Sequence, residues 1–137
     1  MRQGLLLCCM AAVTKPRTSP HRELYGILGT VPDVRGVLRK WNAYFRLQGM
    51  DAFMDRYPAT ARQLPERLSE MFHFDRRLYI VGKSLQKVIL PLLDGVDSFA
   101  KGGVDCVVNE GGILRGYWVG EGLDDPERVM EWMECCD

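Results

Sequence analysis

Short apolar runs alternate with helical patterns between residues 24 and 93, and this alternation constrains the fold more than any other feature. The runs at 24–30, 50–58 and 78–81 are rich in apolar and β-favouring residues and predict buried strands. Each is followed by a segment whose apolar residues recur every three or four positions, as in a helix with one buried face. Strands separated by helices form parallel sheets, because the helix returns the chain to the same end of the sheet. We therefore predict an α/β domain whose sheet is parallel at first.

Residues that start and stop helices support the three predicted helices. Asp33 is suited to cap the first helix and Gly49 to end it. Pro65 fits the first turn of the second helix, and Ser84 is suited to cap the third. The expected inward-facing residues are Val34, Val37, Leu38, Trp41, Tyr44 and Phe45 in the first helix, Leu68, Met71 and Phe72 in the second, and Leu85, Val88, Ile89, Leu92 and Leu93 in the third. Pro91 should end or bend the third helix, because proline has no N–H to donate.

The last third of the sequence predicts a hairpin and a final helix. A short helical piece at 96–101 leads to two apolar runs separated by Asn109–Gly112, whose glycines suit a hairpin turn. The final helix begins at Pro126, with Val129, Met130 and Met133 on one side. Together these elements predict a three-layer αβα sandwich with a mostly parallel mixed sheet and a C-terminal antiparallel hairpin.

The charge and cysteine content excludes several classes of function. Eighteen basic residues balance eighteen acidic ones, so no surface for nucleic acid or an anionic membrane is expected. The five cysteines lack C-x-x-C spacing and only two histidines are present, so neither a metal site nor a disulfide framework is predicted. This pattern favours a cytoplasmic protein. Secretion is the alternative, because the nine apolar residues 5–13 have the length of a signal-peptide core, although Met10 is also a possible start.

The segment Gly82-Lys83-Ser84 resembles the end of a phosphate-binding loop. Such a loop needs a glycine five residues earlier so that its backbone amides converge on the phosphates, and that position is Arg77. The residues between, 78–81, favour an extended strand, so a nucleotide site is not expected here.

Several motifs occur in an order and spacing that resemble the N-terminal, substrate-binding domain of shikimate dehydrogenase. They are YGILG at 25–29, WNAYF at 41–45, Gly49, IVGKSLQ at 80–86, VILPLLD at 88–94, Ala100, VDCVV at 104–108 and GYWVGEG at 116–122. We expect a leader or disordered extension at 1–22, because residues 14–20 contain proline and serine. The resemblance implies a substrate-binding domain at 23–122 and the start of the family's linker helix at 123–137. It also implies a relation to the NADP-dependent oxidoreductases and to the shikimate pathway of aromatic amino acid biosynthesis.

The side chains that carry the family's chemistry are altered. The resemblance implies that a lysine and an aspartate act on the hydroxyl that is oxidised, and these positions are Gln86 and Gly120. An amide cannot take up the proton and glycine has no side chain, so no catalytic residue is expected. A one-residue slip would bring Lys87 to the lysine position, but it would also turn that side chain by about 100° around a helix.

The resemblance also indicates where substrate contacts would lie. The family's S-x-S element, which holds the substrate carboxylate, maps onto Arg35 and Val37. Its threonine and asparagine contacts map onto Gly82 and Val107. No cofactor site is expected in this chain, because it stops where the linker helix would lead to the family's NADP-binding domain.

The sequence leaves three functions open. The first is a non-catalytic module that binds a small carboxylate metabolite or a protein partner, with Arg35, Lys83 and Lys87 as anion-facing groups. The second is a divergent or truncated shikimate dehydrogenase that needs a separate, NADP-binding cofactor domain. The third is a fragment with an exposed C-terminal edge, which would leave Trp118, Trp132 and Met133 at the surface and favour a homo-oligomer.

Overall fold

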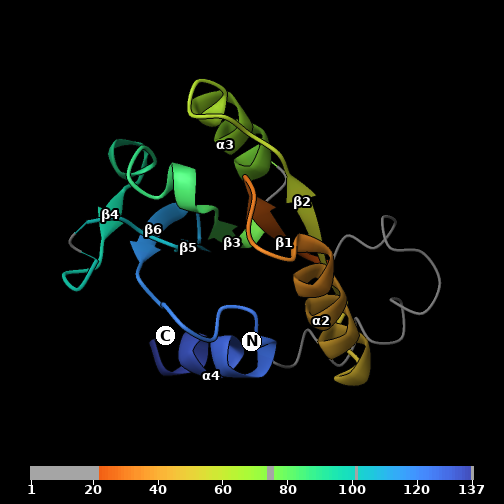
Figure 1. Cartoon of the computed structure of the whole chain (residues 1–137). Coiled ribbons are helices and arrows are strands. Elements are labelled where there is room, and N and C mark those ends of the chain that lie inside the picture. The colour runs from red at the N-terminus through yellow and green to blue at the C-terminus, as the bar shows by residue number, and fades with distance from the viewer. Residues whose placement is uncertain (1–21, 74–75, 101, 137) are drawn as a thin grey trace.

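The computed structural model describes residues 22–73, 76–100 and 102–136, without the side chains of 70–73, 76, 135 and 136. The predicted leader, including the apolar run 5–13 and Met10, lies outside the described residues except for Arg22. The elements are β1 (Glu23–Leu28), α2 (Val34–Leu47), β2 (Ala52–Tyr57), α3 (Leu64–His73), β3 (Arg76–Val81), the 3-10 helices η1 (Lys83–Leu85) and η2 (Leu90–Leu92), β4 (Gly95–Val96), β5 (Cys106–Glu110), β6 (Ile113–Tyr117) and α4 (Pro126–Cys136). Figure 1 shows their arrangement.

The strands form one mixed sheet in the order β2-β1-β3-β5-β6-β4. β1 pairs in parallel with β2 and β3, and β4 pairs in parallel with β6. β5 runs antiparallel to both of its neighbours, β3 and β6. β5 is thus the only strand of this sheet that runs against the others. The predicted α/β fold, with its mostly parallel sheet and its hairpin, is confirmed.

Two hydrophobic cores lie on opposite faces of the sheet, because successive strand side chains point to opposite sides. On β1, Tyr25 and Ile27 join the core that includes residues of α2 and α4, whereas Leu28 joins the core that includes Leu64 and Leu68 of α3. In Figure 1, α2 and α4 accordingly lie below the sheet and α3 lies above it. The predicted three layers are therefore present.

Helix α2 follows its sequence signals closely. The Asp33 carboxylate accepts a hydrogen bond from the Gly36 N–H at the N-terminus, and Gly49 lies just beyond the helix with a φ of 66°, which glycine adopts without strain. Trp41 and Phe45 are buried against Tyr25, with ring centroids 5.9 and 4.8 Å from the tyrosine ring. The predicted inner face of this helix is confirmed.

The Asn42 side chain joins α2 to the edge of the sheet. Its Oδ1 accepts a hydrogen bond from the Met54 N–H at 2.8 Å, and its Nδ2 donates to the Met54 carbonyl at 3.0 Å. Met54 lies in β2, which has β1 as its only neighbouring strand in this sheet. The amide of Asn42 therefore binds the polar backbone groups that this edge strand would otherwise leave to water.

The predicted helix at 85–93 is wrong, since two 3-10 turns take its place. An α-helix would need an N–H at Pro91 to bond the Lys87 carbonyl, and proline has none; the Leu90 N–H bonds that carbonyl instead, at 3.2 Å. Leu85 and Ile89 are buried as expected, but Val88 and Leu92 are exposed. The short helical piece predicted at 96–101 is also wrong, because β4 pairs with β6 and a turn follows it.

The C-terminal helix α4 is packed against the rest of the domain, contrary to what the fragment hypothesis predicts. Met133 is 4% exposed, and the Trp132 ring contacts the Tyr117 ring edge-on at 5.0 Å. The expectation that these two residues are stranded at the surface is therefore wrong, and of the three named residues only Trp118 is exposed. Among the described residues, no helix is long and apolar enough to cross a membrane.

Candidate functional site

A cavity of about 510 Å³ opens where β1 and β3 end. Its walls come from the loop after β1, the start of α2, the end of β3, the residue before β5 and the segment 118–124. In open α/β sheets, ligands bind beyond the carboxyl ends of the parallel strands, because the loops diverge there and leave a crevice. The position of this cavity makes it the candidate binding site, which we call the strand-end cavity.

Asp105 holds two parts of this cavity together. Its two carboxylate oxygens accept hydrogen bonds from the Val119 and Gly120 N–H groups, each at 2.8 Å. Its backbone carbonyl accepts from the Val81 N–H at 2.9 Å. One residue thus joins the end of β3 to the segment that follows β6. The same segment is also held to α2, because the Trp41 Nε1–H donates a hydrogen bond to the Leu123 carbonyl at 3.1 Å.

Burial controls the ionisation of Asp105 and of its neighbour Cys106. Asp105 is 3% exposed, and loss of solvation raises the pKa of its carboxyl, although the two N–H donors partly offset this effect. Burial also raises the pKa of the Cys106 thiol, and the nearby Asp105 charge adds to that rise. The Cys106 thiol is therefore a core group and not a nucleophile.

Gln86 lines the cavity at the position that the family resemblance assigns to a lysine. Its side-chain Nε2 donates a hydrogen bond to the Val81 carbonyl at 3.2 Å. Gly120 also lines the cavity, with a φ of 77° that favours glycine. The two positions thus line one cavity, and neither carries a group that can exchange a proton near neutral pH.

Gly82 has no room for a side chain. A Cβ placed on it would lie 2.5 Å from the Thr30 carbonyl oxygen and 2.7 Å from the Thr30 nitrogen. The loop after β1 therefore packs directly on the backbone at the end of β3. This close approach explains why glycine occupies the position that the resemblance assigns to a threonine.

The residue that caps the N-terminus of α2 presents its carboxylate to the cavity. Asp33, which has a left-handed backbone conformation with a φ of 51°, lines the strand-end cavity together with Val37. A Cβ on Gly36 would meet the Asp33 carboxylate at 2.1 Å, so the glycine allows this carboxylate to fold over the helix end. Arg35 is exposed and lines neither cavity.

An exposed ion pair lies at the rim of the strand-end cavity. The Lys40 Nζ and the Asp124 carboxylate are 3.2 Å apart, with 60% and 56% of their side chains exposed. Both residues line the cavity. A pair so open to water contributes little to stability, typically less than about 1 kcal/mol.

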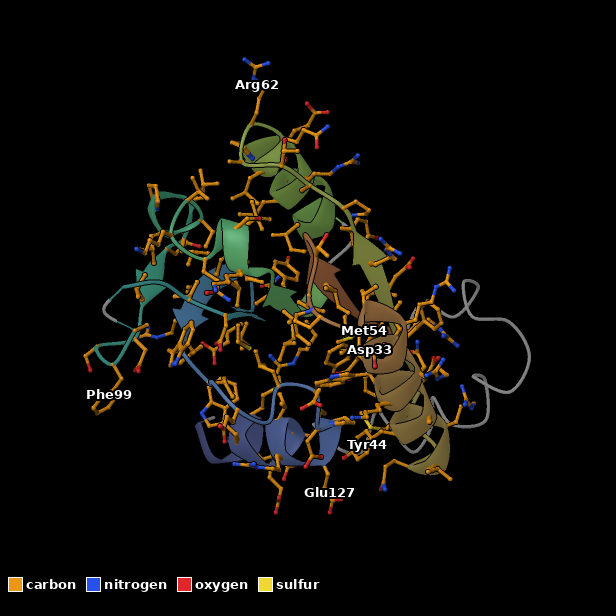
Figure 2. The ribbon with its side chains drawn as sticks, viewed as in Figure 1. Asp33, Tyr44, Met54, Arg62, Phe99 and Glu127 are labelled. Carbon is orange, nitrogen blue, oxygen red and sulfur yellow. The ribbon has the colours of Figure 1, made fainter. Side chains whose placement is uncertain are left out.

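A second cavity of about 520 Å³ adjoins the first, and we call it the lysine cavity. Lys83, Gln86 and Trp118 line both cavities, so they form the boundary between them. The remaining lining residues are Ser84, Lys87, Phe99, Gly102 and Gly103. Figure 2 shows Asp33 at the start of α2 and Phe99 projecting from the loop after β4, far from one another.

The structure distributes the sequence-predicted residues unevenly. Val37, Lys83, Gln86 and Gly120 line the strand-end cavity, and Lys87 lines the lysine cavity. Val107 does not belong with them, because it is fully buried in the core that includes α3.

The missed residue is Asp105, two positions before Val107. Val107 lies within β5 and is buried in the core, whereas Asp105 precedes β5 and lies in the cavity wall. The sequence feature that could have identified Asp105 is that it is the only carboxylate in the apolar run VDCVV. In the part of the chain that the structure describes, no group of three His, Cys, Asp or Glu side chains could hold a metal ion.

No protein family and no curated protein sequence matches this chain. Among solved structures, it is similar to shikimate dehydrogenase of Aquifex aeolicus, with 26% identity over 72% of the chain and a TM-score of 0.66. It is also similar to shikimate 5-dehydrogenase of Listeria monocytogenes, solved with shikimate and NAD, with 24% identity over 77% of the chain and a TM-score of 0.68. The 5-ketofructose reductase of a Gluconobacter strain matches 87% of the chain with 17% identity and a TM-score of 0.68.

The chain spans 38%, 37% and 42% of the lengths of these three proteins. The resemblance to shikimate dehydrogenase that the sequence motifs indicated is therefore confirmed as a likeness in fold to part of those enzymes.

Proposed function

We propose that this chain is a binding domain that takes a small hydroxylated carboxylate metabolite and has no catalytic activity of its own. The observation that carries this proposal is an open cavity at the strand ends whose Gln86 and Gly120 stand where the family resemblance implies a proton-transferring pair. The cavity is large enough for a small metabolite. The scaffold that positions a ligand is retained, while the groups that would act on its hydroxyl are replaced.

The altered pair supports the absence of catalysis. Positioned acid–base groups commonly contribute about 10² to 10⁴ in rate, and the Gln86 amide, already bonded to the Val81 carbonyl, supplies no such group. The Lys40–Asp124 pair does not replace it, because both side chains are more than half exposed.

The ligand class follows from the similar structures and the cavity lining. Those proteins are named for shikimate, which is a hydroxylated carboxylate, and for 5-ketofructose, which carries hydroxyl groups without a carboxylate. Hydroxyl groups are the shared chemistry. The carboxylates and the Gln86 amide that line the strand-end cavity are suitable partners for them.

Isothermal titration of the purified chain with shikimate, quinate and 3-dehydroshikimate tests binding, and an NADPH absorbance assay beside it tests turnover. We expect heat from at least one compound and no change in NADPH. Turnover would revive the alternative of a divergent shikimate dehydrogenase, in particular if it appeared only when a separate NADP-binding domain was added. The absence of both signals would overturn the proposal and leave a protein partner as the explanation.

A pair of tryptophan substitutions locates the binding. Val31 is half-buried and lines the strand-end cavity, so Val31→Trp should fill it and weaken binding at least about tenfold. Leu47 is 84% exposed at the other end of α2, so Leu47→Trp adds the same side chain without reaching the cavity. Equal affinities of the two variants would place the ligand elsewhere.

A further inference from the structure

The two adjoining cavities carry opposite charge. Four carboxylates and two lysines line the strand-end cavity, namely Asp33, Asp105, Glu121, Asp124, Lys40 and Lys83. Among the residues that the structure describes, the lysine cavity is lined by Lys83 and Lys87 and by no carboxylate. A ligand that carries both hydroxyl groups and one negative charge therefore meets two different environments at the same site.

The start of α2 is a poor place for the negative group. A helix N-terminus attracts anions through its free N–H groups, but the Asp33 carboxylate already accepts the Gly36 N–H at 3.3 Å. A second carboxylate there would lie beside a fixed negative charge and be repelled. Arg35, one of the positions expected to bind a carboxylate, is exposed and lines neither cavity.

Unlike the start of α2, the lysine cavity presents positively charged side chains to an anionic group. Lys83 and Lys87 lie four residues apart in the turns that follow β3, and both are exposed side chains that line one cavity. The Ser84 hydroxyl lies between them in sequence and lines the same cavity. Phe99, which is 82% exposed, and Trp118, which is 50% exposed, add apolar surface against which a carbon skeleton can pack.

We infer that the anionic group of the ligand binds in the lysine cavity, between Lys83 and Lys87, while its hydroxyl groups occupy the strand-end cavity. The shared lining residues make one ligand able to reach both. This inference rests on the proposed function, because it assumes that the strand-end cavity binds the hydroxylated part. It places the ligand carboxylate in the lysine cavity and not at the start of α2, where the sequence resemblance placed it.

A matched pair of probes tests the charge preference. 3,4-Dihydroxybenzoate and 3,4-dihydroxybenzamide have the same ring and hydroxyl groups, and only the first carries a charge at neutral pH. Isothermal titration at low ionic strength should give about tenfold tighter binding of the acid, since two exposed lysines each add a modest attraction. Added salt should reduce that preference.

Charge-neutralising variants locate the anion. Lys83→Gln/Lys87→Gln should abolish the preference for the acid over the amide. Arg35→Gln is the matched control, because it removes one exposed positive charge at the start of α2 and should leave the preference intact. Loss of the preference in Arg35→Gln but not in the double variant would overturn the inference and place the anion at α2.

The outcomes separate this inference from the proposed function. Binding of shikimate or of either probe without a preference for the acid would overturn the inference alone. No binding of any of these compounds would overturn both. Circular dichroism of each variant confirms that the fold is retained before affinities are compared.

Discussion

Replacing Asp105 by asparagine tests how the strand-end cavity is held together. The carboxylate accepts two N–H groups, from Val119 and Gly120, and an asparagine side chain has only one acceptor oxygen. One N–H therefore loses its partner and faces the amide NH2 group instead. At low pH the protonated carboxyl still has acceptor capacity on both oxygens, whereas the amide nitrogen has none, so the unsatisfied N–H should cost about 1–3 kcal/mol.

The pH dependence of that loss gives a sharper test. Because the pKa of Asp105 is raised in the folded protein, its contribution to stability is complete below the pKa of the unfolded chain and is lost as the pH rises through the folded pKa. The free-energy difference between the wild type and Asp105→Asn should therefore shrink as the pH rises from about 4 to 8. Urea denaturation at five pH values across this range, followed by tryptophan fluorescence, measures that difference.

Asp94→Asn is the matched control for this experiment. Asp94 is an exposed carboxylate that accepts one hydrogen bond from the Leu114 N–H, also at 2.8 Å. An asparagine there can keep that single bond through its own oxygen, so a smaller loss is expected. A difference for Asp105→Asn that grew with pH would refute the reasoning, because it would mean that the N–H donors outweigh burial. Equal losses at both sites would show that the second hydrogen bond is unimportant.

Three further predictions concern the scaffold. Asn42→Ala removes both hydrogen bonds to Met54 and should cost about 1–3 kcal/mol in a urea titration, whereas Asn42→Asp keeps the acceptor and should cost less. Gly82→Ala forces a Cβ against the Thr30 backbone and should lower stability by about 1–3 kcal/mol, while Gly102→Ala, with no atom within 4 Å, should change it by less than about 0.5 kcal/mol. The Cys106 thiol should resist alkylation at pH 8 until the protein unfolds, as peptide mass mapping would show; rapid labelling of the folded chain would contradict its burial.

The elements best predicted from sequence were those in which local and long-range signals agree. Asp33, the apolar stripe through Trp41 and Phe45, and Gly49 all indicate the same helix, and packing on Tyr25 reinforces it. The apolar runs at β1 and β3 likewise became strands because the sheet buries both of their faces. When local sequence signals and long-range packing favour the same structure, a segment can be predicted from one sequence.

The segment from 83 to 100 was misjudged because the spacing of its apolar residues fits more than one structure. Leu85 and Ile89 are four apart, which suits an α-helix, but a chain of 3-10 turns also buries both. Pro91 disfavours the α-helix, because it has no N–H to donate to the Lys87 carbonyl. Nothing in the local pattern indicated that Gly95 and Val96 pair with β6, because that contact joins residues about twenty positions apart.

The candidate site was predicted in part. Gln86 and Gly120 line one cavity. The role of Asp105 was missed, because the alignment assigned the contact to Val107, which is fully buried in the core, and not to the carboxylate that precedes β5. The division of charge between the two cavities is a property of the folded chain, since Asp33, Glu121 and Lys87 are distant in sequence.

The bond between Asn42 and Met54 has a consequence for how copies of this chain meet. A free edge strand is a template on which another chain can add a strand, and this is a common route to cross-β fibres. At β2, the central N–H and C=O are already satisfied by a side chain from the same molecule. A second copy would have to displace that amide before extending the sheet, so Asn42 protects the protein against fibre growth along this edge.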